Sequence, residues 1–558
     1  MSKLHDSVRY YLLVAGLGLL SASVSIAFYR LYIEVWGFTR GALSYSIIIL
    51  IPLSFLAVGI PYVIVKLFAN TKTTGSGTHT VLEAYHLTNG EIGLKDTLAK
   101  PTAAMMTIGL GGSAGPEGPS LLVGGGIASA LSKRFRIQAD LRRRLFIAGA
   151  AAGLSATFRT PLTGILFALE IPYKNDLDRE TFIEAAIASV PAYLLSIAVL
   201  GSEPIFAIQG NTSITLIEIA LSLLLGLICG LYSVFFTKTF SWTQNLSFKL
   251  RKKIGNLGLV TLGAAVLNIS GLISIYTIGI GLPFVNALIN GATFTTASLI
   301  AIILSKTFAT ATTLNFGGTG GLFFPTIVVG AGIGYLFSSL FSVNFAVMFV
   351  AVGMAALLAG THKVLLTPVA FVVETLGGMF AIPALLASGV SYLLSGNNSF
   401  YSLQPRTRVK TEELALERFF LKGVDLIPEK LRKTSVDDIM TKNPITLNQG
   451  TTVEKALETF ERTKLRVLPV TSENEHVVGV INLEDLGYID VTRKDMSLSE
   501  TIMHKPTLIN VDTSLEQVAQ LMMNTQQDHV FVTDKDERLM GVVSGIDVVK
   551  KILELLSS

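Results

Sequence analysis

The chain has 558 residues, of which 50% are hydrophobic, 15% are charged and 50 are glycine, a composition that excludes an ordinary soluble protein and predicts a membrane protein. Its net charge is only +4 and its basic residues stand in short runs between apolar segments, which indicates topology signals rather than a nucleic-acid surface. The single cysteine, Cys229, excludes a multi-cysteine metal site, and no two of the seven histidines have the spacing of an HExxH zinc protease, so we expect neither an enzyme nor a bound metal.

Two long apolar runs come first. Tyr10–Phe28 and Ser44–Phe68 are each long enough to span a membrane. No small-residue cleavage site follows the first run, so we expect a membrane helix rather than a removed signal. Beyond them the apolar segments are short and interrupted by glycine and proline, at Gly75–Gly77, Gly109–Gly118, Gly124–Gly126, Pro161–Gly164, Gly317–Gly321 and Gly330–Gly334. Interrupted helices at membrane depth are tolerated where they line a cavity, so this pattern predicts a transport site.

The segment Gly111–Ser120, with the sequence GGSAGPEGPS, places one carboxylate, Glu117, between two prolines and among glycines. Free backbone N–H groups at the start of the helix that follows would attract negative charge, so the segment predicts an anion site. An ionised Glu117 can fill that site itself, and a protonated one can leave it to another anion, which makes Glu117 a candidate gate. The alternative is that Glu117 is only an acid favourably placed at a helix N-terminus.

Two pairs of segments repeat in the same order and at nearly the same offset. Gly115–Gly126 can be laid over Gly321–Gly332 without a gap, and Leu162–Glu170 over Leu366–Glu374. The overlays predict two related halves of broken, tilted helices, which we expect to be inverted relative to each other. Halves that each donate a broken helix to a site at the membrane midplane are a common transporter design.

Four segments resemble the signature segments of the CLC chloride channels and chloride/proton exchangers. They are Gly75–His79, Gly115–Pro119, Gly321–Pro325 and the Ser-Phe-Tyr-Ser around Tyr401. The resemblance covers residues 1–404. It implies a mostly α-helical, multi-pass protein of the cell membrane that is embedded in the lipid bilayer, carries chloride and forms a homodimer with one pathway per subunit.

The resemblance also implies which groups bind the anion. The hydroxyls of Ser76 and Tyr401 would donate to a partly dehydrated chloride, with Glu117 as the external gate. Backbone N–H groups would add their dipoles, at Gly118, Leu322 and Phe323. Neutral donors of this kind bind an anion weakly enough for it to leave again. The alternatives are that Ser76 is a helix cap, that Tyr401 is an interfacial aromatic and that Phe323 is a core residue.

The departures from the family pattern bear on the mechanism. His79 stands where a proline is common, and Pro116 stands where a basic residue commonly precedes the gating glutamate. Proton-coupled exchangers usually carry an inward-facing glutamate directly after the residue matching Glu170, and here that position is Ile171, which cannot carry a proton. The sequence therefore favours a passive chloride channel gated by Glu117 and opened by acid, with chloride/proton antiport as the alternative.

Glu170, Glu374, Lys306 and Lys363 are further ionisable residues in or near apolar segments. We expect Glu170 and Glu374 to be repeat-related structural acids rather than proton relays. A hypothesis from another class is a divalent-cation transporter regulated by a C-terminal soluble module. It would need a cluster of intramembrane carboxylates, whereas Glu117, Glu170 and Glu374 are scattered singly along the chain.

The composition changes abruptly after Tyr401. Residues 405–433 are charged and mostly polar and are predicted to form a linker. Two α/β units of ordinary soluble composition follow, at residues 434–490 and 491–556. They closely resemble a tandem pair of CBS domains because several segments recur between them, namely Ile439–Pro444 as Ile502–Pro506 and Gly479–Asp485 as Gly541–Asp547. In this family combination the pair lies in the cytoplasm.

Such pairs often bind adenine nucleotides in the cleft between the repeats, so we expect ATP, ADP or AMP as an optional regulator and no required cofactor. In the resemblance Asp547 matches the aspartate that accepts the ribose hydroxyls, and Thr446 lies where a repeat commonly lines the cleft. Asp485 is the weaker equivalent in the first repeat. The alternative is that Asp547 only caps the final helix and that the pair serves for dimer packing.

Overall fold

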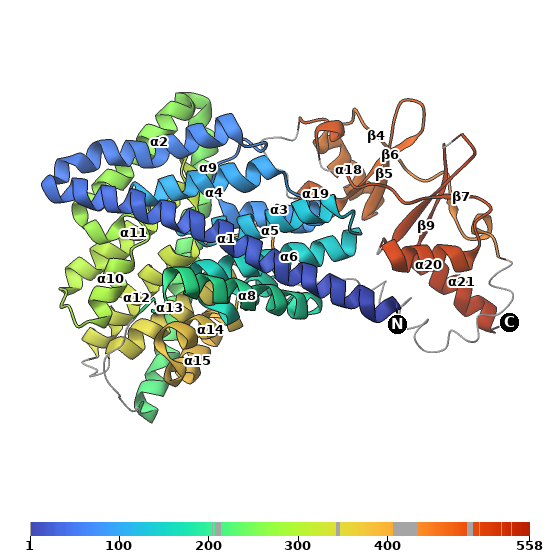
Figure 1. Ribbon diagram of the computed structural model, residues 1–558. Helices are drawn as coiled ribbons and strands as arrows, with labels where there is room; N and C mark the ends of the chain where they lie inside the picture. The colour runs from blue at the N-terminus through green and yellow to red at the C-terminus, as the bar shows by residue number, and fades with distance from the viewer. Residues whose placement is uncertain are drawn as a thin grey trace. The chain divides into compact units, whose positions relative to one another are not determined.

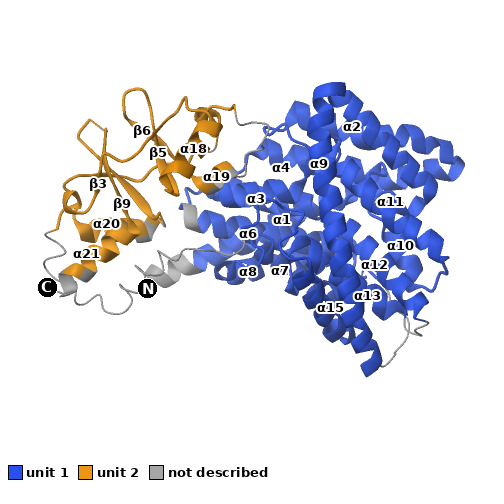
Figure 2. Cartoon of the chain, turned by 180° about the vertical axis from the view of Figure 1, so that it is seen from behind, with its two compact units in different colours: residues 1–408 blue, residues 409–558 orange. Residues whose placement is uncertain are grey.

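The computed structural model describes most of the chain. The described residues are 2–203, 205–206, 214–341, 346–405, 434–487, 495–501, 503–525, 527–536 and 538–557. They form two compact units, Met1–Arg408 and Val409–Ser558, which are blue and orange in Figure 2. Residues 406–433, which make up nearly all of the predicted linker, lie outside the described residues.

The first unit is built almost entirely of helices (Figure 1). They are α1 (Ser2–Tyr45), α2 (Leu50–Phe68), α3 (Gly77–Leu87), α4 (Leu94–Gly109), α5 (Glu117–Arg134), α6 (Ala139–Phe158), α7 (Pro161–Glu170), α8 (Phe182–Leu200), α9 (Leu216–Ile273), α10 (Leu282–Ile289), α11 (Thr296–Asn315), α12 (Phe323–Leu340), α13 (Ala346–His362), α14 (Leu366–Leu376) and α15 (Ala381–Leu394). The unit also contains two short strands, β1 (Gly75–Ser76) and β2 (Thr319–Gly320). The prediction of a mostly helical protein is confirmed.

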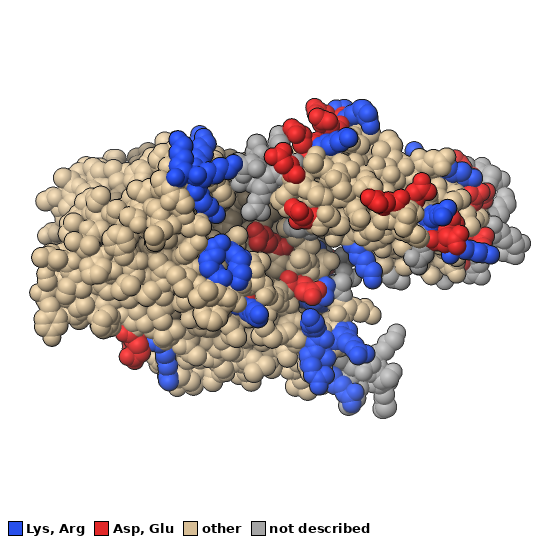
Figure 3. All heavy atoms as spheres, turned by 90° about the horizontal axis from the view of Figure 1, so that it is seen from above, with Lys and Arg blue, Asp and Glu red and all other residues tan. Residues whose placement is uncertain are grey.

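The surface of this unit suits a lipid environment. Within the described residues, six helices are long and apolar enough to cross a membrane. Large apolar side chains on them are exposed, for example Leu216 and Leu257, at 84% and 80%. Broad areas of the face shown in Figure 3 carry no Lys, Arg, Asp or Glu. The predicted membrane protein is therefore confirmed, although its first helix continues past Phe28 to Tyr45 because no proline interrupts it.

Two of the predicted interruptions are wrong. Gly124–Gly126 lies inside α5 and Gly330–Gly334 lies inside α12. A Cβ atom on Gly124 would lie 1.8 Å from the Gly149 carbonyl oxygen, and one on Gly330 would lie 2.4 Å from that of Gly353. These glycines therefore allow α5 to pack closely on α6, and α12 on α13, as small residues commonly do between membrane helices.

The two halves meet in an antiparallel arrangement. Gly115 and Gly321 occupy equivalent positions in the repeat and form an antiparallel bridge, in which each N–H donates to the other carbonyl, at 2.9 and 2.7 Å. Equivalent residues pair in this reciprocal way when a two-fold axis relates the segments that contain them. The predicted relation of the halves as inverted repeats follows from this geometry.

Glu170 and Glu374 repeat the same symmetry. The Glu170 carboxylate accepts hydrogen bonds from the N–H groups of Leu365, Leu366 and Thr367 at the start of α14, at 2.8–3.0 Å. The Glu374 carboxylate likewise accepts from two N–H groups at the start of α7, both at 2.8 Å. Each acid thus satisfies free donors at the N-terminus of a helix in the other half. The structure places both in structural positions.

The second unit contains two small sheets and their helices. The strands are β3 (Thr441–Lys442), β4 (Leu447–Asn448), β5 (Val467–Thr471), β6 (Val477–Asn482), β7 (Leu508–Asn510), β8 (His529–Thr533) and β9 (Leu539–Ser544), and the helices are α18 (Val453–Thr463), α19 (Leu483–Gly487), α20 (Leu515–Thr525) and α21 (Gly545–Ser557). The strand orders are β3-β9-β8-β7 and β4-β5-β6. β3 belongs to the first repeat but pairs with β9 of the second repeat. In the other direction, His504 of the second repeat pairs with Val480 of the first. The predicted pair of α/β repeats is confirmed.

Candidate functional site

Segments that are far apart in the sequence meet at the centre of the first unit. β1 pairs with β2 in parallel, with Gly75 opposite Thr319 and Ser76 opposite Gly320. The bridge between Gly115 and Gly321 adds the loop that precedes α5. Three of the four predicted signature segments are therefore held together by backbone hydrogen bonds. This frame fixes the starts of α3, α5 and α12 next to one another.

Glu117 is the first residue of α5, and its carboxylate accepts a hydrogen bond from the N–H of Phe323, the first residue of α12. The N–H of Phe324 also faces it. The carboxylate is completely buried, and its Oε2 atom has no partner among the residues described. Glu117 belongs to the first half of the protein, whereas α12, the helix whose N-terminus its carboxylate occupies, belongs to the second half. A helix N-terminus with free N–H groups is a site for any anion, so the carboxylate fills an anion site.

Two hydroxyls at the same centre are buried without partners. Ser76 is 8% exposed and Tyr401 is 0% exposed, and neither side-chain oxygen has a hydrogen-bond partner in the described part of the chain. Ser76 precedes α3 but its side chain makes no capping bond, and Tyr401 is too deep for an interfacial aromatic. These observations argue against a capping role for the Ser76 side chain and against an interfacial position for Tyr401. Buried hydroxyls of native proteins normally have partners, so these two are available to a ligand.

The predicted backbone donors lie close by. Leu322 precedes α12 directly, and Phe323 already donates its N–H to Glu117. Gly118 packs against α3, because a Cβ atom on it would lie 2.9 Å from the Thr78 nitrogen. An anion at the start of α12 and the Glu117 carboxylate would compete for the same N–H group.

The structure adds side chains that the sequence analysis missed. The imidazoles of His79 and His362 flank the Tyr401 ring, with centroids 5.0 and 5.5 Å from it. Thr78 contributes a further buried hydroxyl near Tyr401. Thr78 and His79 belong to the first signature segment and could have been found there. His362 carries no sequence signal, since only the fold brings the end of α13 to Tyr401.

A cavity of about 240 Å³ reaches this centre. It touches both Ser76 and His79. The other side chains and backbone groups that line it are Tyr62, Lys66, Lys72, Thr73, Thr74, Gly75, Thr80, Glu83, Phe240, Gln244, Ser247, Phe248, Arg251, Asn256, Leu314 and Asn315. The lining therefore contains three cationic side chains, Lys66, Lys72 and Arg251, and one carboxylate, Glu83. A cavity lined mainly by one sign of charge concentrates ions of the opposite sign. The cavity suits an entrance for anions.

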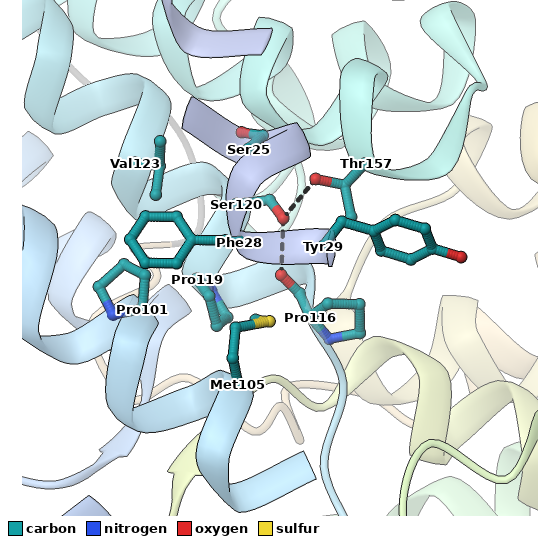
Figure 4. A pocket seen from close by; sticks show the side chains of 10 residues that line it. All are labelled: Ser25, Phe28, Tyr29, Pro101, Met105, Pro116, Pro119, Ser120, Val123 and Thr157. Carbon is teal, nitrogen blue, oxygen red and sulfur yellow. Dashed lines mark hydrogen bonds between the residues drawn. The ribbon is translucent and has the colours of Figure 1, made fainter. Parts of the chain in front are cut away.

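A second hollow lies behind the Glu117 loop (Figure 4). It measures only about 10 Å³, room for no more than one water molecule. Ser120 closes it by donating to the Pro116 carbonyl at 2.8 Å and by bonding the Thr157 hydroxyl at 2.7 Å. An anion cannot pass there, so this side of α5 is packing rather than pathway.

The second unit places the predicted nucleotide residues in different repeats. Asp547 is the third residue of α21 and accepts from the N–H and the hydroxyl of Ser544, at 3.0 and 2.7 Å, so it helps to cap this helix. Thr446 is exposed just before β4 of the first repeat. Asp485 is instead bonded to the imidazole Nε2 of His504 at 2.9 Å, which raises the pKa of His504 above its ordinary value. Of the two equivalent aspartates, Asp485 therefore already has a hydrogen-bond partner in the other repeat.

Comparisons with known proteins bear on both units. The model of the voltage-gated chloride channel family matches residues 60–396, and the CBS domain model matches residues 436–486 and 498–554. Chloride channel protein CLC-f of Arabidopsis thaliana is 27% identical over 442 residues, which are 69% of this chain and 56% of the plant protein. The H⁺/Cl⁻ exchange transporter ClcA of Vibrio cholerae is 28% identical over 328 residues, which are 56% of this chain and 69% of that protein.

Solved structures share the fold. A CLC-type fluoride/proton antiporter matches with a TM-score of 0.62 at 22% identity, over 72% of this chain and 99% of its own. A eukaryotic CLC transporter matches with a TM-score of 0.62 at 18% identity, over 98% of each chain. At these identities the likeness concerns the fold alone, and it confirms the predicted architecture.

Proposed function

The chain belongs to the voltage-gated chloride channel family, and we propose that it moves chloride across a membrane in exchange for protons. The observation that carries the proposal is the position of Glu117, whose carboxylate occupies the anion site at the start of α12. The buried, unpartnered hydroxyls of Ser76 and Tyr401 supply neutral donors for a chloride ion next to it.

Competition for one site couples the two ions. An ionised Glu117 holds the Phe323 N–H and keeps an anion out, whereas a protonated Glu117 has lost the charge that this N–H attracts. Chloride can then take the vacated site, and the proton travels on the displaced carboxylate. Weak binding by hydroxyl and amide dipoles lets the chloride leave again.

One of the two named relatives favours exchange over the passive conduction that the sequence predicts, whereas CLC-f of Arabidopsis thaliana is named a chloride channel protein. ClcA of Vibrio cholerae is named an H⁺/Cl⁻ exchange transporter. Passive chloride conduction is the second candidate, and the observation in its favour is Ile171, an aliphatic residue buried directly after Glu170. The expected homodimer, the cell-membrane location and the cytoplasmic side of the CBS pair remain predictions.

Exchange predicts uphill proton movement. The full-length protein is reconstituted into liposomes with an outward chloride gradient and equal pH on both sides, and valinomycin with equal potassium holds the membrane potential at zero. We expect chloride efflux to draw protons into the vesicles, so the external pH rises until a protonophore collapses the difference. Chloride efflux without any change in pH would instead establish passive conduction.

We further propose that an adenine nucleotide binds the second unit beside Asp547, because Asp485, the equivalent aspartate, is engaged by His504. Calorimetry on the full chain in detergent with ATP, ADP and AMP tests this. Asp547→Asn keeps an oxygen for the Ser544 cap but loses the charge, and we expect it to weaken binding roughly tenfold or more. Asp485→Asn is the matched control and should bind like the parent. Equal binding by all three proteins would contradict the assignment.

A further inference from the structure

His362 is the most isolated basic group at the centre of the first unit. Its side chain is 0% exposed at the end of α13, and its Nε2 atom has no hydrogen-bond partner among the described residues. Its ring contacts four aromatic rings, which belong to Phe167, Phe323, Phe400 and Tyr401. A buried polar atom without a partner needs an explanation in function, since it costs stability.

The hydrogen bonds favour the tautomer of His362 that carries its proton on Nδ1. Thr361 Oγ1 lies 2.9 Å from His362 Nδ1 and gives its own proton to the Leu357 carbonyl at 2.8 Å. A hydroxyl has a single proton to donate, so Oγ1 accepts from Nδ1–H. The unpartnered Nε2 atom therefore holds a free lone pair, which is the group that a proton can join.

His362 stands next to the groups that hold the gate. It contacts the ring of Phe323, whose N–H binds Glu117, and the ring of Tyr401, whose hydroxyl is unpartnered among the described residues. Below it, Gln404 Nε2 donates both to the His362 carbonyl at 3.1 Å and to the Ile171 carbonyl at 2.7 Å. Gln404 thus links the backbone of His362 to that of Ile171.

Two other titratable side chains of the described chain share this aromatic cluster. Tyr401 is in ring contact with His362, and His79 is in ring contact with Tyr401. Lys363 follows in the chain, but its ammonium donates to the Tyr392 carbonyl and to the Ser395 hydroxyl. The Glu170 carboxylate already accepts hydrogen bonds from three N–H groups that follow His362 in the chain. Among the described carboxylates, Glu117 is linked to the His362 ring through Phe323 and can exchange a proton with it.

We propose that His362 carries the exchanged proton to and from Glu117, an inference that rests on the proposed exchange. The Nε2 lone pair accepts a proton from a hydronium ion, which leaves as water, and the new N–H bond makes the ring an imidazolium. The imidazolium then transfers this proton to the Glu117 carboxylate, directly or through a water molecule, and recovers its lone pair. The reverse sequence serves transport in the other direction, and Nδ1–H stays in place throughout.

Liposomes that report chloride and protons together test the inference. His362→Phe and His362→Gln cannot take up a proton, and glutamine also preserves polarity if phenylalanine disturbs folding. We expect both variants to continue to release chloride while the number of protons moved per chloride falls roughly tenfold or more. His86→Gln is the matched control, because His86 is a histidine of the same unit whose Nε2 is bonded to the Pro172 carbonyl. It should keep the parental ratio.

The outcomes separate the two proposals. Parental proton coupling in the His362 variants would overturn the role of His362 and leave exchange intact. A proportional loss of both fluxes would show that His362 is structural only. A parent protein that moves no protons would overturn exchange itself, and the role of His362 with it.

Discussion

Glu117→Gln is expected to release chloride from liposomes at a rate that does not depend on pH and to move no protons. Glutamine has the shape of the protonated acid but no charge with which to hold the Phe323 N–H, so the anion site stays open. In the parent, chloride efflux should rise as the pH falls, by up to about tenfold per pH unit above the pKa of the gate, because the protonated fraction changes by that factor. Efflux with a chloride electrode at several pH values measures both proteins.

Glu83→Gln provides the control for this experiment. Glu83 lines the 240 Å³ cavity but lies away from the start of α12, so its variant should keep the pH dependence of the parent. If Glu117→Gln remains as sensitive to pH as the parent, the gate is another group and the proposed competition is wrong.

Glu170→Ala is expected to cause the largest loss of stability. The change removes a buried acceptor from three N–H groups and the Thr367 hydroxyl. Each unsatisfied buried donor costs about 1–3 kcal/mol, so the free energy of unfolding should fall by at least about 3 kcal/mol. Thermal unfolding of the protein in detergent measures the change.

Two variants calibrate that measurement. Glu170→Gln keeps one acceptor oxygen and should fall between the parent and Glu170→Ala. Glu91→Ala removes an exposed carboxylate of the same unit that pairs with Arg142 at 3.3 Å, and an exposed pair contributes no more than about 1 kcal/mol. A melting temperature for Glu170→Ala equal to that of Glu91→Ala would contradict the capping role.

The parts of the site that depend on local patterns could be predicted from the sequence. The sequence itself shows the glycine and proline loops and the acid at position 117. The repeat can be found by comparing one segment of the chain with another. The sequence also predicted an anion site at a helix N-terminus. It could not predict that the helix start filled by Glu117 belongs to α12, because the contact with Phe323 spans 206 residues.

Other features depend on how the helices and strands pack together, and this packing cannot be predicted from a single sequence. The role of a glycine is ambiguous in the sequence, since Gly124 and Gly330 allow close helix contacts while Gly115 and Gly321 form the antiparallel bridge between the halves. His362 and Tyr401 lie side by side because α13 packs against the C-terminal segment of the first unit. The pairing of β3, from the first repeat, with β9 of the second repeat likewise depends on the tertiary structure.

The most direct test of the central claim is to locate a halide in crystals of the parent and of Glu117→Gln soaked in bromide, by anomalous diffraction. The account predicts bromide in contact with the hydroxyls of Ser76 and Tyr401 in both crystals, and a further bromide at the Phe323 N–H only where the carboxylate has been removed. Bromide that lies away from these groups in both crystals would contradict the account.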